Sequence, residues 1–381
     1  MTPLILLFGL AFLVSVDIRI LTPVLPSISS SLGATPGVVG LAVTSYSFAY
    51  GTGQLFYGPL SDRMGRIAVV RAAGLGFSLC TVLSALAMTT WQFIAIRFVA
   101  GVFAGAVIPL ALVYIGDTVE YGRRQVVLGR FFAVTSAAFA FSASIGGTVA
   151  HFVSWRFMLL GYAVLALIPV GLMWRIDAGE PTAMTKAPAA PVHFSDILRS
   201  GRAQAVCVAV FLEGFLLWGS ATYLAAFGTH RHDLDQFSVG LVIALLGAGT
   251  MAGGLCMARV RHWLSENALA ASGGTLMGAA FVLLIPRWSW PVLAASTFLL
   301  GLGYAALHTT LQLRGTEISS TARGKAFSLF VFSLFAGNAT GTAAFGRLVD
   351  AGRYELAFAI SAAGLVAVGL GTALAGRSPK R

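Results

Sequence analysis

The stretch YGPLSDRMGR, residues 57–66, decides how the rest of the sequence is interpreted. It places Asp62, Arg63 and Arg66 directly behind the pair Gly58–Pro59, and it stands between two long apolar runs. Proline and glycine interrupt helices and allow tight turns. We therefore expect the apolar helix before this stretch, the second of the chain, to end near Pro59. The charged residues should then occupy a short turn between two apolar helices.

The composition indicates a membrane protein. Of the 381 residues, 57% are hydrophobic and 10% are charged, whereas soluble domains carry roughly 25% charged residues. A soluble fold of this length could not hide so much apolar surface, because its exterior must be covered by polar atoms. The net charge of +11 lies in short loops without a basic stripe, so nucleic acid is not an expected partner.

Apolar runs long enough to cross a bilayer, which takes about 20 residues, recur along the whole chain. The first run lacks a basic leading segment and a small-residue cleavage site, so we expect a retained span and not a signal peptide. The predicted spans are 3–24, 38–58, 67–88, 91–115, 129–150, 156–175, 203–228, 237–258, 267–286, 290–312, 324–347 and 354–375.

The longest polar segment, 176–202, is rich in proline and alanine and falls near the middle of the chain. It is predicted to be a cytoplasmic linker between two six-helix bundles, residues 1–175 and 203–381. The bundles repeat weakly, since Asp17 and Glu213 occupy corresponding positions in the first helix of each. Most of the 25 Lys and Arg residues fall in loops on the side of the two termini. The positive-inside rule then predicts both termini in the cytoplasm.

Two motifs give the sequence a family resemblance along essentially its whole length. Residues 58–66, GPLSDRMGR, match in full the helix 2–3 signature of the major facilitator superfamily, and RFVAG at 97–101 keeps the Arg and Gly of its helix 4 signature. The sequence resembles in particular the bacterial 12-helix drug:proton antiporters and their arabinose-efflux-like relatives. The resemblance implies an all-α membrane protein with 12 transmembrane helices in two pseudo-symmetric six-helix bundles, acting as a monomer.

One antiporter motif is degraded. SASIGG at 142–147 keeps both glycines of the helix 5 signature but has Ser142 and Ala143 where that signature has Gly-Pro. The helix 2–3 signature, called the loop motif below, has a second copy between helices 8 and 9. In this sequence that copy, GGLCMARVRHW at 253–263, has lost its acid. The departure in helix 5 weakens the assignment to the antiporters more than the assignment to the family.

The loop residues are predicted to form a conformational latch. Asp62 can meet the positive N-terminal end of the helix that starts near Arg323, a contact worth about 0.3–1 kcal/mol when exposed and up to about 2 when partly buried. The resemblance implies the same role, which is to favour the outward-open state. The alternative is a solvated turn that only obeys the positive-inside rule. The latch residues are Gly58, Asp62, Arg63, Gly65 and Arg66.

Five ionisable residues fall inside predicted spans: Asp17, Arg19, Arg97, Glu213 and His308. A charge at mid-helix costs at least about 2.5–3.5 kcal/mol on insertion scales, so such residues are functional candidates. We expect Asp17, Arg97 and Glu213 to couple transport to protons. A structural pair with an arginine is the alternative for Asp17, and a satisfied polar contact is the alternative for Glu213.

The predicted substrate cavity is lined by Arg19 and His308 together with one face of helix 2. Tyr46, Tyr50 and Gln54 lie four residues apart and therefore share that face. The same stripe is equally compatible with a contact between helices, and a lone histidine on an apolar helix is often a hydrogen-bonded structural residue.

These observations predict a secondary active transporter of the bacterial inner membrane, which exports a small organic solute or drug by proton antiport. Uptake by proton symport or facilitated diffusion is an alternative that the altered helix 5 motif keeps open. A non-transporting membrane sensor is an alternative of another class. The sequence shows no P-loop, metal cluster or nucleophile set, so no enzymatic activity, cofactor or metal is expected. The expected partners are the substrate, protons and the lipid bilayer.

Overall fold

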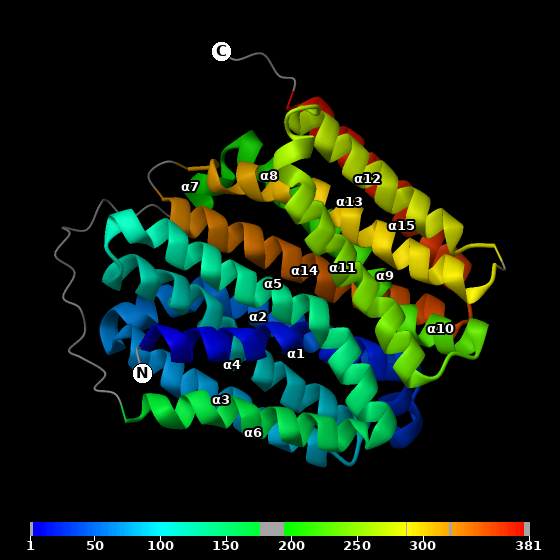
Figure 1. Ribbon diagram of the computed structural model, residues 1–381, viewed down its shortest axis with the longest axis horizontal. Coiled ribbons are helices and arrows are strands. Elements are labelled where there is room, and N and C mark those ends of the chain that lie inside the picture. The colour runs from blue at the N-terminus through cyan, green and yellow to red at the C-terminus, as the bar shows by residue number, and fades with distance from the viewer. Residues whose placement is uncertain (1–2, 176–193, 287, 320–321, 377–381) are drawn as a thin grey trace.

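The computed structural model describes residues 3–175, 194–286, 288–319 and 322–376, and its regular structure in these ranges is entirely helical. Long helical segments cover all the predicted spans in order (Figure 1). The N-terminal half contains α1 (Pro3–Leu32), α2 (Pro36–Met64), α3 (Arg66–Leu86), α4 (Thr90–Thr118), α5 (Tyr121–Phe152) and α6 (Trp155–Met173).

The C-terminal half begins with a helix interrupted by an irregular turn. A short helix α7 (Phe194–Leu198) precedes it. The interrupted helix consists of α8 (Gly201–Glu213), the π-helical turn η1 (Gly214–Trp218), α9 (Gly219–Ala221) and α10 (Leu224–His232). The remaining helices are α11 (Gln236–Val260), α12 (Glu266–Leu283), α13 (Trp290–Thr316), α14 (Arg323–Asp350) and α15 (Tyr354–Ala375).

Ten helical segments in the described ranges are long and apolar enough to cross a membrane, so the chain is a multi-pass membrane protein. The two predicted spans outside this set are α2 and α12. Both contain many Gly, Ala, Ser and Thr residues and pack closely against neighbouring helices. Small and weakly polar residues suit such contacts within the bilayer.

The turn between α2 and α3 lies later than expected. Helix α2 continues through Pro59 to Met64, and the chain turns at Gly65, whose φ of +87° suits glycine. The expectation that helix 2 ends near Pro59 is wrong, because a proline removes only one backbone hydrogen bond and neighbouring groups in a membrane helix compensate for it.

Side chains cap several helices at their N-termini. Thr35 accepts a hydrogen bond from the Val38 N–H at the start of α2, and Asp235 accepts one from the Ser238 N–H at 2.7 Å at the start of α11. Hydrogen bonds from the backbone and hydroxyl groups of Ser238 lower the pKa of Asp235 below its ordinary value. These caps fix where the helices begin in the loops.

Two large clusters of buried hydrophobic side chains form the interior. One is built mainly from α1–α6 and the other mainly from α8–α15, and Figure 1 shows these two sets of helices in the lower and upper parts of the molecule. The division into bundles 1–175 and 203–381 stays a prediction. Most of the predicted linker 176–202 lies outside the described residues, and α7 falls within the rest of it.

The two sets of helices meet along α2 with α14 and along α5 with α11. Hydrogen bonds join Thr44 Oγ1 to the Ala339 carbonyl at 3.1 Å and Asn338 Nδ2 to Ser47 Oγ at 3.0 Å. These residues lie in the first half of α2 and the second half of α14, which run antiparallel. We name the two ends of this helix pair after the acids found there: the Asp350 end, where α2 begins, and the Asp62 end, where it finishes.

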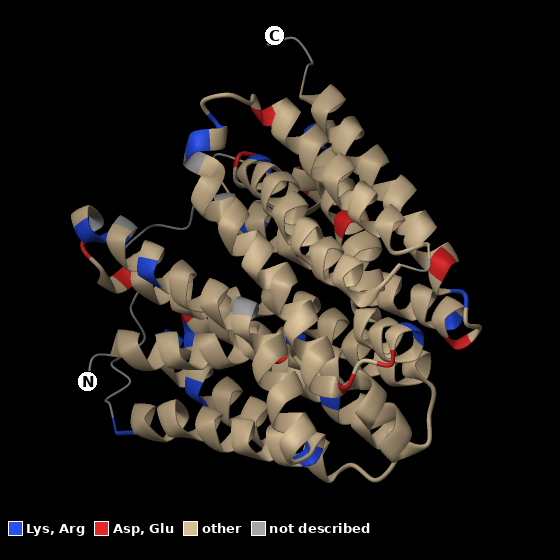
Figure 2. Cartoon of the chain, turned by 45° about the vertical axis from the view of Figure 1, so that its right-hand side comes forward, with Lys and Arg blue, Asp and Glu red and all other residues tan. Residues whose placement is uncertain are grey.

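Charged residues are rare along the helices and more frequent near their ends, as Figure 2 shows. This distribution is expected for helices that cross a bilayer, because the hydrocarbon core excludes charge. The few charges that remain between the helices therefore define the candidate site.

Candidate functional site

A buried ion pair joins α1 to α4. The Arg97 guanidinium donates from Nη1 to Asp17 Oδ1 at 3.1 Å and from Nη2 to Oδ2 at 2.6 Å. Both residues are only 1% exposed. The bidentate geometry fixes the relative position of two helices and is the strong form of this interaction. The sequence predicted both residues as candidates, and the structure brings them together.

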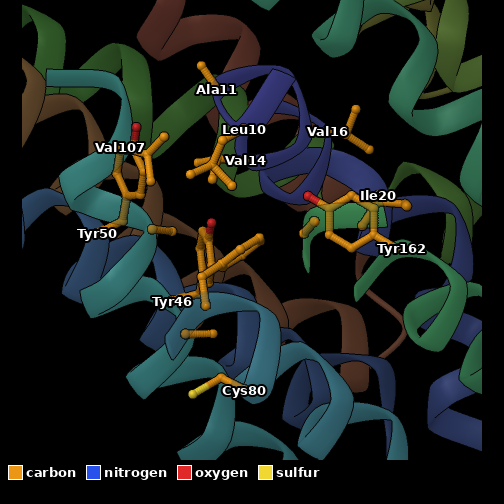
Figure 3. Close-up of a cluster of buried hydrophobic side chains, with 14 of the residues drawn as sticks. Leu10, Ala11, Val14, Val16, Ile20, Tyr46, Tyr50, Cys80, Val107 and Tyr162 are labelled. Carbon is orange, nitrogen blue, oxygen red and sulfur yellow. The ribbon is translucent and has the colours of Figure 1, made fainter. Parts of the chain in front are cut away.

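Aromatic and aliphatic side chains surround this pair. The Arg97 guanidinium carbon lies 4.3 Å from the centre of the Tyr46 ring, a cation–π contact. Figure 3 shows Tyr46 and Tyr50 on successive turns of α2, together with apolar residues of α1 such as Leu10 and Val14. The pair is thus held in a dry environment, where electrostatic interactions are strong.

The face of α2 predicted to line a cavity is packed in this structure. Tyr46 and Tyr50 are 2% exposed and Gln54 is 9% exposed. The Tyr50 ring lies 4.4 Å from that of Phe335 on α14, measured between ring centres. This packing favours the alternative, a contact between helices, for the conformation seen here. A role of these three residues in substrate binding stays a prediction.

A second pair, of a buried acid and a partly buried histidine, joins α8 to α13. His308 Nδ1 lies 2.8 Å from Glu213 Oε2, and Glu213 is fully buried. Its other oxygen, Oε1, has no hydrogen-bond partner among the described residues. The π-helical turn η1 follows Glu213 directly, and such turns are frequent at functional sites.

The two pairs occupy matching places in the two halves. In each, an acid on the first helix meets a nitrogen-bearing side chain on the fourth: Asp17 with Arg97, and Glu213 with His308. The sequence indicated the correspondence of the two acids but assigned His308 to the cavity. The signal for the second pair was available, since Arg97 and His308 are both ionisable residues within the fourth span of their half.

Arg19 links the two halves at the level of these pairs. Its guanidinium carbon lies 3.4 Å from the centre of the Trp218 ring on η1, and Trp218 packs edge-on against Tyr304 with 5.0 Å between ring centres. Tyr304 in turn stacks on His308 at 4.7 Å. Arg19 and Trp218 also line a small cavity of about 30 Å³ between α1, α5, η1, α10 and α11, together with Thr22 and Ser142.

The loop motif forms a charge cluster within its own half. Asp62 pairs with Arg66 at 2.5 Å, and Arg66 Nε lies 3.3 Å from Asp117 at the end of α4. Arg66 also donates to the Ser61 hydroxyl. Arg63 borders a groove on α2 and α4 with Tyr57 and Leu60. The predicted contact between Asp62 and the start of α14 stays a prediction for another conformation.

Sequence reasoning missed Asp350, the last residue of α14. Its Oδ1 accepts a hydrogen bond from the Gly37 N–H at 2.8 Å, and its Oδ2 accepts one from the Thr35 hydroxyl at 2.7 Å. An acid from the C-terminal half therefore caps the N-terminus of α2. A sequence signal existed: GRLVDAGR at 346–353 resembles GPLSDRMGR at 58–66.

Charge pairs buried between the helices of a multi-pass membrane protein are frequent along the substrate and ion pathways of membrane transport proteins. The family model of the Major Facilitator Superfamily matches residues 7–313, and the chain belongs to that family. It is 27% identical over 348 residues to the uncharacterized MFS-type transporter YceJ of Bacillus subtilis, with 90% of this chain and 88% of that protein covered.

Two further comparisons show the range of related proteins. The chain is 25% identical to a chloramphenicol resistance protein of Pseudomonas aeruginosa over 79% of this chain and 73% of that protein. The crystal structure of a mutant of the nucleoside transporter NupG matches with a TM-score of 0.81 at 12% identity, covering 99% of this chain and all of the other. The fold is therefore that of the family.

Proposed function

We propose that this transporter exports a small organic solute across the cell inner membrane in exchange for protons, acts as a monomer and has both termini in the cytoplasm. The excess of Lys and Arg in the loops on the side of the termini supports this orientation. The similarity to a chloramphenicol resistance protein supports export.

The observation that carries the proposal is the buried pair of Asp17 and Arg97. A carboxylate inside the bilayer is costly unless a partner neutralises it. When the guanidinium moves away, protonation becomes the remaining way to remove the charge. Asp17 then takes up a proton in the state in which Arg97 has moved away from it. In the other half, Glu213 takes up a proton when His308 has moved away.

The conformation supports alternating access. The hydrogen bonds that join α2 to α14 lie between Thr35 and Ser47 on α2, in the half of that helix next to the Asp350 end. With both termini in the cytoplasm, the Asp350 end faces the periplasm and is closed, so this is an inward-facing state. The Asp62 latch is then open, and it closes in the outward-facing state.

One observation favours the reverse direction. The residues Ser142 and Ala143 replace the Gly-Pro of the helix 5 antiporter motif, and both line the small cavity beside Arg19. Uptake by proton symport or facilitated diffusion is therefore the second candidate. It predicts accumulation of a solute in cells that express the protein, where export predicts resistance to it.

The first test is the growth of a bacterial host that lacks its major drug pumps, on a panel of toxic compounds and metabolites. Cells that express the wild-type chain should tolerate some of these compounds, and cells that express Asp17→Asn at an equal level should not. Asp233→Asn removes an exposed acid and is the matched control. If no compound is tolerated, or if Asp17→Asn still protects, the export proposal fails and uptake assays follow.

A further inference from the structure

We propose that Asp350 is a second latch, which holds the periplasmic side closed by capping α2 across the interface between the two halves. It is the counterpart of Asp62 at the opposite end of the same pair of helices. The inference concerns how the two access states are balanced, and it does not depend on the substrate or on the direction of transport.

The geometry is that of an N-cap supplied by another helix. The first backbone N–H groups of a helix have no partner within it, and they carry a partial positive charge. Thr35 caps α2 locally. The Asp350 carboxylate adds two bonds, one from the Gly37 N–H at 2.8 Å and one from the Thr35 hydroxyl at 2.7 Å. These bonds connect residues 313 and 315 positions apart in the chain.

Close approach at this point requires glycine on both helices. A β-carbon on Gly37 would collide with the Gly346 carbonyl oxygen and with the Asp350 carboxylate. One on Gly346 would collide with the Tyr223 hydroxyl and lie 3.1 Å from Gly37 Cα. The backbones therefore touch beside the carboxylate, which places the contact at a built interface and not at a chance surface encounter.

The sequence around Asp350 repeats the pattern of the loop motif. Both stretches read Gly-x-Leu-x-Asp and are followed within three residues by Gly-Arg: GPLSD at 58–62 and GRLVD at 346–350. The glycines after the two acids, Gly65 and Gly352, both have positive φ, at +87° and +70°. Each acid thus lies in the last turn of its helix, shortly before a glycine with positive φ.

Because α2 and α14 run antiparallel, Asp350 lies beside the start of α2, and Asp62 lies in the last turn of α2, toward the end at which α14 begins. Asp350 occupies the α2 N-terminus in this structure, while Asp62 pairs with Arg66 of its own half. The contact of Asp350 with α2 is thus formed, while the contact of Asp62 with α14 is open. We infer that the helix pair alternates between the two, with Asp350 bound in the inward-facing state and Asp62 bound in the outward-facing state.

The test measures how often the periplasmic side opens. Ser27, which donates to Gln236 of α11 at 2.8 Å, lies in the contact between α1 and α11 and does not touch Asp350. In a chain without its three native cysteines, Ser27→Cys reports opening through its rate of reaction with a membrane-impermeant maleimide in right-side-out vesicles. Loss of a charged cap should raise this rate about tenfold in Asp350→Asn, which corresponds to about 1.4 kcal/mol.

Three comparisons keep the test decisive. Asp233→Asn makes the same change at an exposed site and should leave the rate within about twofold of its starting value, and Thr35→Ala should give a smaller rise than Asp350→Asn. Asp62→Asn should lower the rate, because it removes the opposite latch. A purely structural role for Asp350 would not produce effects of opposite sign in the two acids. An unchanged rate in Asp350→Asn, or a rise in both variants, overturns the proposal.

No substrate is needed for this measurement. Its outcome is therefore separate from the resistance test. The assignment of the Asp350 end to the periplasm rests on the proposed orientation, but it does not depend on export.

Discussion

The two buried pairs stand in equivalent places but are chemically unlike. In the N-terminal half, Asp17 uses both of its oxygens to bind a guanidinium, which stays protonated in proteins. In the C-terminal half, Glu213 uses one oxygen to bind an imidazole, a group that ordinarily changes its charge near neutral pH. The two halves therefore hold an ionisable pair at the same place, but the partner of the acid is a different chemical group in each.

The difference between the two pairs indicates how readily each can rearrange. The pair of Asp17 and Arg97 is closed, because both carboxylate oxygens bind the guanidinium. The pair of Glu213 and His308 leaves one buried oxygen without a hydrogen bond among the described residues. An unsatisfied buried group favours rearrangement, and the neighbouring π-helical turn supplies an irregular backbone for it.

The largest effect is expected from Arg97→Gln. This change leaves the Asp17 carboxylate buried without its charged partner, which should cost about 3–5 kcal/mol of stability. Thermal unfolding in detergent measures the loss. The double variant Asp17→Asn/Arg97→Gln should recover most of it, because no buried charge remains. If the single variant is as stable as the double variant, the pair is not held together by charge.

The second effect tests the imidazole pair. His308→Gln removes the partner of a buried carboxylate and should cost about 1–3 kcal/mol, less than Arg97→Gln. Thermal unfolding in detergent measures the loss. A loss as large as that of Arg97→Gln would contradict the difference between the two pairs.

A smaller effect is expected where Arg19 of the N-terminal half contacts Trp218 of the C-terminal half. Trp218→Leu removes the ring under Arg19, and a cation–π contact is worth about 0.5–2 kcal/mol. Trp218→Phe keeps a ring at this position and should lose less. Unfolding curves of the two variants give the comparison, and equal losses would mean that only the size of the side chain matters.

The smallest effect is expected at Asp235, which contributes a pH dependence to stability that is unrelated to the two pairs. Hydrogen bonds from Ser238 lower the pKa of Asp235 in the folded state. The ionised Asp235 therefore stabilises the folded state fully at a pH above the ordinary Asp pKa of about 3.9. This stabilisation is lost as the pH falls through the lower pKa of the folded state. Asp235→Asn keeps a capping side chain but does not titrate. Its stability should differ in pH dependence from the wild type only in that acidic range.

The fold was predictable from the sequence because apolar runs of the required length are a direct consequence of the bilayer. The ends of helices were less predictable, as α2 shows: its proline suggested an end at Pro59, but the chain turns at Gly65. The buried acids were found because charge inside a membrane is costly. Their partners were not all found, since spacing within one helix does not reveal which helix packs against it.

Asp350 shows a second limit. One of its two partners is a backbone N–H, that of Gly37, and a backbone group leaves no mark in the sequence. The resemblance between GRLVDAGR and GPLSDRMGR acquires meaning only once the structure shows that α2 and α14 pack against each other.

The length of α2 and α14 has a consequence for how the membrane itself acts on the protein. These helices have 29 and 28 residues, and at about 1.5 Å per residue each is about 43 Å long, well beyond a hydrocarbon core of about 30 Å. Both terminal carboxylates then lie at the level of the lipid headgroups, where water and ions weaken each contact. Bilayer thickness and headgroup charge should therefore shift the balance between the two access states without touching the buried pairs.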